Sequence, residues 1–398
     1  MKSKLSHLLI ILPFFLLTAC KTDITPEWER YYSQAQDDES RVQWLSNISV
    51  DSYGDIISAG STVLIGGNRQ QNILVVKHND NGNIIWTTEY DIAQGAYRSD
   101  DKITDMVVDG DDNIYVIGVR YIVENEQQRY GSFIMKIDSY GDINWISELS
   151  NQEDARDLEI QNDQLYVTGF ATQIFDLNGQ QLLKVDHNKA WDIEVDESGN
   201  FYIAGSTKVE KYDANGQLVW SNKQPTDLNL QASLALNQDG SVVVAHNHDD
   251  RSTRVAVIAS NGTTQWSKRY QPAQQSYGFP GPALVKTDWR EDIFVSLSND
   301  RGRRIVKLDD LGQQNWQVTS KGIVQDFLIG DNSEVYAVGG GINEKYDTTG
   351  KLLGSTVQTA ATQITTGSIA INGDDMYVGY SAVNNGEIDF YLAKFIDE

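Results

Sequence analysis

The chain has 398 residues, of which 32 are Lys or Arg and 56 are Asp or Glu, so its formal net charge is −24 at pH 7. A surface this acidic repels DNA, RNA and anionic lipid headgroups, and we therefore exclude nucleic acid as a partner. The sequence contains one cysteine, Cys20, which excludes an internal disulfide.

The first element is a short apolar segment behind a charged start. Lys2 and Lys4 precede the ten residues from Leu8 to Leu17, and Thr18 and Ala19 follow. Ten apolar residues are too few to cross a bilayer as a helix, whereas this order of regions is typical of a secretory signal peptide. We predict that residues 1–19 are such a peptide. Its removal takes away two lysines and no acidic residue, which leaves 30 basic and 56 acidic residues and a net charge of −26.

Leu17-Thr18-Ala19-Cys20 resembles the lipobox of bacterial lipoproteins. The resemblance implies that Cys20 becomes the new N-terminus and the site of lipid attachment, with palmitate among its acyl chains. Lys21 follows, and not the Asp that resembles an inner-membrane retention signal, which favours the outer membrane, on its periplasmic side or at the cell surface. An ordinary secretory signal with a chance cysteine is the alternative. Residues 20–38 are polar and show no repeating pattern, and we predict that they form a lipidated tether.

Two phrases of residues then recur along the chain. The first is an alternating apolar stretch, then Asp or Asn, then Gly, then Trp four residues after the Gly, as from Gly82 to Trp86. Five copies keep the Trp, and two have lost it, with Leu183 and Gly354 in its place. The second phrase is a hairpin of two strands joined by an acidic turn, such as Val107 to Gly118, and it occurs eight times.

This pattern predicts the fold. Alternation between Asx-Gly turns favours antiparallel strands, and four strands in a unit of about 40 residues are typical of a propeller blade. The chain ends at Phe390 to Asp397, inside a copy of the first phrase, and Asp37 to Trp44 supplies the missing end. We therefore predict one all-β domain over residues 39–398. It is an eight-bladed β-propeller of four-stranded antiparallel blades, and the N-terminal strand closes the last blade.

The repeats resemble those of quinoprotein-like propellers and related bacterial lipoproteins, including the propeller lipoprotein of the outer-membrane β-barrel assembly machinery. In such repeats the Trp after the Gly packs between neighbouring blades. The resemblance implies this inter-blade structural role for six residues here: Trp44, Trp86, Trp145, Trp220, Trp266 and Trp316. It implies architecture more than function, because one fold serves many functions.

The strand directions predict which face binds a partner. The turns between the first and second strands, and between the third and fourth, share one face, which we name the turn face. The long connections share the opposite face, the long-loop face. Arginine and aromatic residues dominate the energetics of interfaces, and in this acidic chain the long connections carry Arg98, Arg120, Tyr121, Arg129, Tyr130, Arg269, Tyr270, Tyr277, Phe279, Arg301 and Arg303. Long loops that only carry exposed polar residues are the alternative.

Motifs for chemistry are weak. Asp109 to Asn113 begins like a calcium loop, but no bidentate Glu follows, so a plain turn is favoured. His246 and His248 lie on one side of a strand without an evident third ligand. Gly339 to Gly341 lacks the Lys-Ser/Thr of a phosphate loop, and no Gly-x-Ser-x-Gly elbow occurs. We predict no metal, no cofactor and no enzymatic activity.

We expect a membrane-anchored, non-enzymatic scaffold that presents one propeller face to a protein partner in the cell envelope. The alternative is a binder of glycans or small molecules, with or without enzymatic activity, in a central pocket on the long-loop face. The aromatic residues that suggest this pocket are Tyr97, Tyr121, Tyr130, Tyr270 and Tyr277. A calcium-stabilised surface protein is a third hypothesis.

Overall fold

A computed structural model describes the protein over residues 24–33, 41–64, 70–92, 98–124, 127–149, 154–224, 231–248, 252–271, 283–297, 304–357 and 364–396. The predicted signal peptide and Cys20 lie outside these ranges. Every regular element within them is a β-strand. No described helix is long and apolar enough to cross a membrane.

The described strands form units of four antiparallel strands, numbered here as blades in chain order. Six units are separate sheets, and blades 1 and 2 are joined into one eight-stranded sheet by a short parallel pairing of Gln70 and Gln71 with Ser99 and Asp100. Blade 1 comprises β2 (Arg41–Val50), β3 (Ile56–Leu64), β4 (Gln70–His78) and β5 (Ile84–Tyr90). Blade 2 comprises β6 (Arg98–Val108), β7 (Ile114–Glu124), β8 (Gln127–Ile137) and β9 (Ile143–Leu149). Blade 3 comprises β10 (Asp157–Gln161), β11 (Gln164–Thr168), β12 (Ala171–Asp176) and β13 (Gln181–Asp186). Blade 4 comprises β14 (Ala190–Val195), β15 (Phe201–Gly205), β16 (Lys208–Tyr212) and β17 (Leu218–Lys223).

The second half of the chain repeats this plan. Blade 5 comprises β18 (Ala232–Leu236), β19 (Val242–Asn247), β20 (Thr253–Ile258) and β21 (Thr264–Tyr270). Blade 6 comprises β22 (Leu284–Thr287), β23 (Ile293–Leu297), β24 (Arg304–Leu308) and β25 (Gln314–Thr319). Blade 7 comprises β26 (Asp326–Ile329), β27 (Val335–Gly339), β28 (Ile342–Tyr346) and β29 (Leu352–Val357). Blade 8 joins both ends of the described chain, because β30 (Ile364–Asn372), β31 (Asp375–Asn384) and β32 (Glu387–Ile396) are completed by β1 (Trp28–Tyr32).

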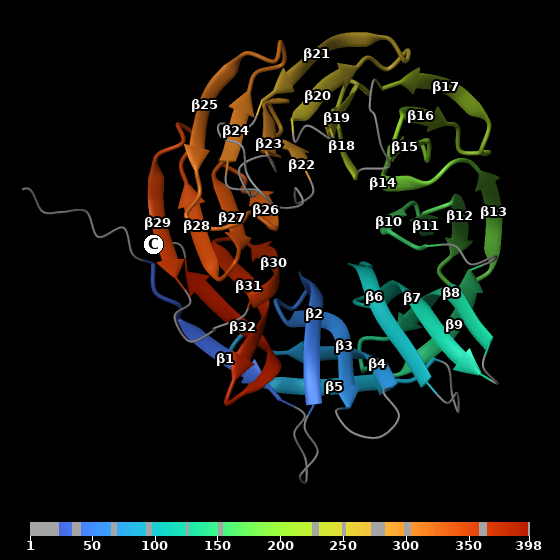
Figure 1. Cartoon of the computed structure of the whole chain (residues 1–398), viewed down its shortest axis with the longest axis vertical. Helices are drawn as coiled ribbons and strands as arrows, with labels where there is room; N and C mark the ends of the chain where they lie inside the picture. Colours follow the sequence, from blue (N-terminus) through green and yellow to red (C-terminus); the bar gives the residue numbers. More distant parts are fainter. Residues whose placement is uncertain are drawn as a thin grey trace, which may run out of the picture.

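The units form a closed ring with their first strands innermost (Figure 1). Each innermost strand contacts the next, from β2 through β6 to β30, and β30 contacts β2 again. The buried apolar side chains form clusters that each join two neighbouring blades, one cluster for each junction. This closed arrangement is compatible with the eight blades predicted from the sequence, and it leaves the core between blades rather than within one sheet.

The Asx-Gly turns explain why the strands end where they do. In the turn after β8, Asp138 Oδ1 accepts hydrogen bonds from the backbone N–H groups of Tyr140 and Asp142. Gly141 has a φ of +91°, a conformation that costs glycine little. The same carboxylate-to-backbone pattern recurs in other turns of this face, at Asp176, Asp213, Asp309 and Asp347.

The repeated Gly and Trp belong to different junctions. Trp266 in blade 5 lies over Gly312 in the outer turn of blade 6, where an added Cβ would sit 2.9 Å from the indole ring. Its Nε1 donates to the carbonyl oxygen of Asp310 at 2.7 Å. The same Trp-on-Gly contact, with an indole hydrogen bond to the same turn, joins other blades through Trp86, Trp145, Trp220 and Trp316.

The prediction for Trp44 is wrong, because Trp44 lies in β2, the innermost strand of blade 1. Trp28 in β1 takes the inter-blade position instead. Its ring lies over Gly82, and its Nε1 donates to Asp80 O at 2.7 Å. The N-terminal strand does complete the last blade, but that strand is Trp28–Tyr32, paired with β32 from Trp28↔Lys394 to Tyr32↔Phe390. The propeller therefore begins before residue 39, inside the segment predicted to be a tether.

The segment before β1 also explains one lost tryptophan. Gly354 in β29 stands where other repeats have Trp, and an added Cβ there would collide with the side chain of Ile24. Ile24 N donates to Ser355 O at 3.2 Å, and Thr356 Oγ1 donates to Ile24 O. Ile24 therefore fills the space of the missing indole and straps blade 7 to blade 8.

The ring is uneven on its long-loop face. In blades 8, 1 and 2 the first three strands have 9 to 11 residues, whereas in blades 3 to 7 they have 4 to 6. The extra residues of β7 and β8 form a hairpin that runs to the pair Glu124↔Gln127. Because the turns on the other face are equally short in all blades, the long strands project on the long-loop face and leave a step between blade 2 and blade 3.

Candidate functional site

A cavity of about 480 Å³ lies at this step, and we name it the step cavity. Blade 2 contributes Arg120 and Tyr121 from β7 and Tyr130 from β8, and blade 3 contributes Phe170 from the β11–β12 connection. The rings of Tyr121 and Tyr130 are 4.9 Å apart between centroids. Tyr130 is 58% exposed and Phe170 46% exposed, so both walls of the cavity present aromatic surface to solvent.

Charged groups fix the wall on blade 2. Arg120 Nη2 forms an ion pair with Glu148 Oε1 of β9 at 2.7 Å, so the Arg120 side chain lies across Gly131 of β8. Asp101 lies opposite Arg120 in the β6–β7 pairing and is fully buried. It accepts a hydrogen bond from the backbone N–H of Ile92 at 2.9 Å. Burial raises the pKa of Asp101 to about 7.

The structure separates the residues predicted for recognition. Arg120, Tyr121 and Tyr130 meet in the step cavity, and Arg129 is exposed on the same hairpin. Arg269 and Tyr270 lie far along the ring in β21, the outer strand of blade 5, where Tyr270 packs against the core between blades 5 and 6. The remaining predicted residues lie outside the described side chains: Arg98, Tyr277, Phe279, Arg301 and Arg303.

An ordered cluster of charged and aromatic side chains borders the step cavity on its inner side. Asp154 forms ion pairs with Arg156 and, at 3.0 Å, with Lys189 Nζ. Both cations lie over the ring of Trp191, at 3.9 Å for the Arg156 guanidinium and 4.6 Å for the Lys189 ammonium. Trp191 Nε1 donates to Ser206 Oγ at 3.1 Å. One carboxylate between two cations leaves this spot net positive in a strongly acidic chain.

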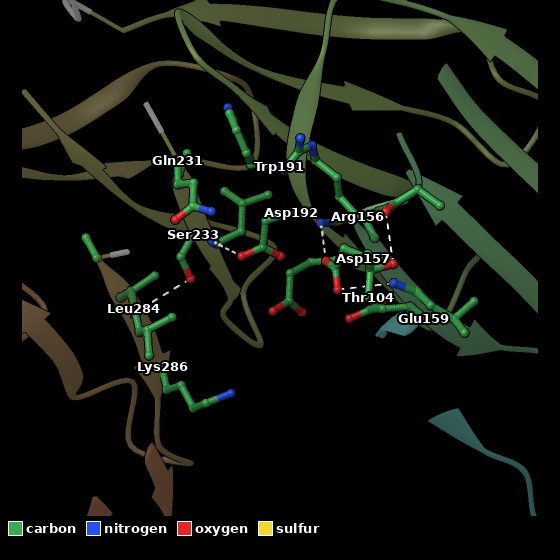
Figure 2. Close-up of a pocket in the computed structure, with 18 of the residues that line it drawn as sticks. Thr104, Arg156, Asp157, Glu159, Trp191, Asp192, Gln231, Ser233, Leu284 and Lys286 are labelled. Carbon is green, nitrogen blue, oxygen red and sulfur yellow. Dashed lines mark hydrogen bonds between the residues drawn. The ribbon is translucent and has the colours of Figure 1, made fainter. Parts of the chain in front are cut away.

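A second cavity, of about 530 Å³, opens at the ring axis, and Asp154 lines both cavities. Figure 2 shows that this central cavity is lined mainly by the innermost strands of blades 3 to 6, with Thr104 from blade 2, and that Arg156 and Trp191 lie on one side and Lys286 on the other. Of the tyrosines that suggested an aromatic pocket, the three that the structure describes do not line it. Tyr121 and Tyr130 line the step cavity, Tyr270 lies in an outer strand, and Tyr97 and Tyr277 are outside the described residues.

Carboxyl groups around the central cavity link one blade to the next. Asp105 Oδ2 accepts the backbone N–H of Leu158 in the following blade, at 2.9 Å. The same bond recurs at later junctions, from Ile193 to Asp157, from Leu234 to Asp192 and from Ile369 to Asp326. Ser233 and Ser368 accept the equivalent N–H groups of Val285 and Ile48. The sequence signal that predicts these links is an Asp directly before an apolar residue of an inner strand, as in Asp157-Leu158 and Asp192-Ile193.

Crowding of these acids changes their titration. Burial, and then the neighbouring Asp157 carboxylate, raise the pKa values of Asp105 and Asp192 well above the usual range. Glu159 and Glu194 face the cavity from β10 and β14. Burial raises the pKa values of both, helped by the neighbouring Glu194 carboxylate at Glu159 and by the Asp157 carboxylate at Glu194. These carboxyl groups are therefore partly protonated near neutral pH, and the wall of the central cavity carries less negative charge than the number of its acidic residues implies.

The calcium-like turn at Asp109 and the histidine at position 246 both make hydrogen bonds within the fold. In the turn at Asp109, its Oδ1 accepts the N–H groups of Asp111 and Asn113, while Asp112 accepts two hydrogen bonds from Ser52. His246 lies in β19 with Nε2 3.3 Å from Gly205 O, and burial lowers its pKa to about 4. Within the described ranges, no three side chains of His, Cys, Asp or Glu are grouped so that they could hold a metal ion.

No protein-family model matches the chain, and no curated protein sequence matches it. Solved structures do. Sqt1 of Saccharomyces cerevisiae aligns with a TM-score of 0.60 at 10% identity, covering 95% of this chain and 100% of that chain. The chain is a β-propeller. Sqt1 of Chaetomium thermophilum aligns with a TM-score of 0.55 at 11% identity, covering 89% and 97%. The WD40 domain of Neurospora crassa Pan2 aligns with a TM-score of 0.51 at 12% identity, covering 80% and 92%. Identities this low establish the propeller fold alone.

Proposed function

We propose that the protein is a lipid-anchored, non-enzymatic scaffold of the bacterial cell envelope, and that its long-loop face binds a protein partner at the step cavity. The observation that carries the proposal is the pair of exposed aromatic walls, Tyr130 on blade 2 and Phe170 on blade 3, beside Arg120. Tyrosine and arginine at the centre of a concave patch are typical of interface hot spots. The propeller fold, which recurs in the WD40 domain above, supports a scaffold role only by analogy.

The test compares the two faces of one molecule. The full lipidated chain is recovered from envelopes in mild detergent as wild type, as Tyr130→Ala/Phe170→Ala, and as the control Tyr53→Ala/Tyr140→Ala. The control tyrosines are each 82% exposed on the turn face. We expect a partner protein that co-purifies with the wild type and with the control, but not with Tyr130→Ala/Phe170→Ala. Equal recovery of the same proteins by all three forms would contradict binding at the step cavity.

The lipid anchor is proposed from the Leu17–Cys20 motif and is tested separately. Intact-mass measurement of the purified protein should show a chain that begins at Cys20 and carries acyl groups, and the Cys20→Ala variant should leave the membrane fraction. A mature chain that starts elsewhere, without acyl mass, would contradict the anchor and leave the binding face untouched.

The central cavity supports a second candidate function, the binding of a small polar ligand such as a glycan. The observation in its favour is that Lys286, Glu159 and Glu194 line an open space at the ring axis, with Trp191 at its border (Figure 2). A panel of saccharides in a thermal-shift assay tests it, with Lys286→Met as the cavity variant. A stabilisation that the variant abolishes would favour this function.

A further inference from the structure

The described chain begins at a defined place on the propeller. Ile24 is bonded to β29 through Ser355 and Thr356, and its side chain packs against the core between blades 7 and 8. Only residues 21–23 separate Ile24 from Cys20. A chain spans at most about 3.6 Å per residue, so the Cα atoms of Cys20 and Ile24 are no more than about 14 Å apart. The tether expected from the sequence is therefore reduced to three residues.

That place is the rim of the ring. β29 is the outermost strand of blade 7, and the start of the described chain lies beside it, away from the central opening (Figure 1). A lipid attached to Cys20, four residues before Ile24, would hold the protein to the membrane at the edge of the ring and not at either of its two faces. Blade 3, whose outermost strand is β13, lies across the ring from blade 7 (Figure 1).

The surface beside Ile24 suits a bilayer interface. Leu353 is 40% exposed and Val357 is 52% exposed, both on β29, and Lys351 is exposed just before them. Apolar side chains next to lysine, whose stem can lie along apolar surface, match the boundary between acyl chains and headgroups. We name Ile24, Lys351, Leu353 and Val357 the anchor rim.

The turn face is unsuited to the same contact. It carries the acidic turns, among them Asp138, Asp213, Asp309 and Asp347. Carboxylates on one face are repelled by anionic headgroups. A propeller lying flat on this face would bring all of these turns to the membrane, whereas a propeller standing on its rim keeps them away from it.

We propose that the propeller stands on the membrane by its anchor rim, with Leu353 and Val357 at the lipid interface and with the long-loop face and the turn face both open to the aqueous phase. The proposal rests on the proposed lipidation of Cys20 and adds an orientation to it. In this orientation the long-loop face is perpendicular to the membrane. The step cavity therefore opens in a direction parallel to the membrane surface, toward a partner that is itself held at the envelope.

The test uses the lipidated full chain in phosphatidylcholine vesicles that contain a lipid with a nitroxide on its headgroup. Since Cys20 is the only cysteine and is blocked by lipid, Leu353→Cys gives a single site for a fluorophore. The matched control is Leu182→Cys, which stands three residues after the turn glycine of blade 3, as Leu353 does in blade 7, and is 48% exposed. We expect strong loss of fluorescence at position 353 and little at position 182.

Two further outcomes separate the orientation from the anchor. A long Gly/Ser spacer inserted after Asp23 should reduce the quenching at position 353 to the level of position 182, because the rim is then free to leave the interface. Equal quenching at both positions in acylated protein without the spacer would overturn the orientation while the anchor stands. Protein whose Cys20 carries no acyl mass would overturn both.

Discussion

At each Trp-containing junction an indole of one blade lies against a turn glycine of the next, and its N–H donates to that turn. The glycine is needed for two reasons, since it has a positive φ and since a Cβ would overlap the ring, as at Gly312 and Trp266. The resemblance to quinoprotein-like repeats implied that such tryptophans are structural. It could not show that the Gly of a repeat contacts the preceding blade while the Trp of the same repeat contacts the following blade, because these contacts are visible only in the closed ring.

Replacing an inter-blade tryptophan should therefore destabilise the ring. Trp266→Ala removes the contact with Gly312 and the 2.7 Å bond to Asp310 O. We expect the free energy of unfolding to fall by about 2–4 kcal/mol, measured by urea titration, because truncation of a fully buried Trp costs about 3–5 kcal/mol and Trp266 is half-buried. The control Trp289→Ala removes an indole that is 64% exposed on a turn and should cost less than about 0.5 kcal/mol. Equal losses would refute the junction role.

A second residue-scale prediction concerns Asp101. Its pKa is raised to about 7 by burial, so the folded state keeps a proton that the unfolded state loses from about pH 4. The free energy of unfolding should therefore fall as pH rises from 4 to 7, by on the order of 2–4 kcal/mol. Asp101→Asn keeps an acceptor for Ile92 N and should reduce this slope in urea titrations between pH 4.5 and 7.5. An unchanged slope would show that Asp101 does not hold the proton.

Among the elements, β1 departs most from the sequence prediction. Asp37 to Trp44 ends in Trp and matched the repeat, yet Trp28–Tyr32 closes the last blade. In blade 8 the third and fourth strands, β32 and β1, come from opposite ends of the described chain. No turn joins them, and so no turn glycine precedes Trp28 as it precedes the other inter-blade tryptophans. The closing strand could be predicted from the repeat count, but its register could not, since register depends on packing against β32, Gly82 and Gly354.

The strap at Ile24 gives a prediction for the two blades that lack Trp. Gly354→Trp restores the repeat residue in blade 7 but places it on Ile24, and we expect a loss of about 1–3 kcal/mol. The matched change Leu183→Trp in blade 3 places an indole where Leu183 already lies over Gly216, and it should change stability by less than about 1.5 kcal/mol. Thermal melts and protease cleavage near residue 24 distinguish them. A stable, protease-resistant Gly354→Trp protein would contradict the strap.

At the scale of the whole molecule, the closed ring and the alternation of strands followed from the repeats. The unequal height of the blades did not, because the extra length of β7 and β8 reads in sequence as a long loop from Arg120 to Tyr130. The step cavity depends on that height and on Asp154, which lies just before the innermost strand of blade 3, and the central cavity depends on Asp154 and on inner-strand residues such as Trp191. Short-range patterns carry little information about them, since their members come from different blades.

The central claim, that the long-loop face binds a protein partner, is tested most directly by photo-crosslinking in the living cell. A benzophenone amino acid is placed at Tyr130 or at Tyr140, which belong to the same blade, are 58% and 82% exposed, and lie on opposite faces. We predict a discrete protein adduct from position 130 and none from position 140. No adduct from position 130, or the same adducts from both positions, would contradict the claim.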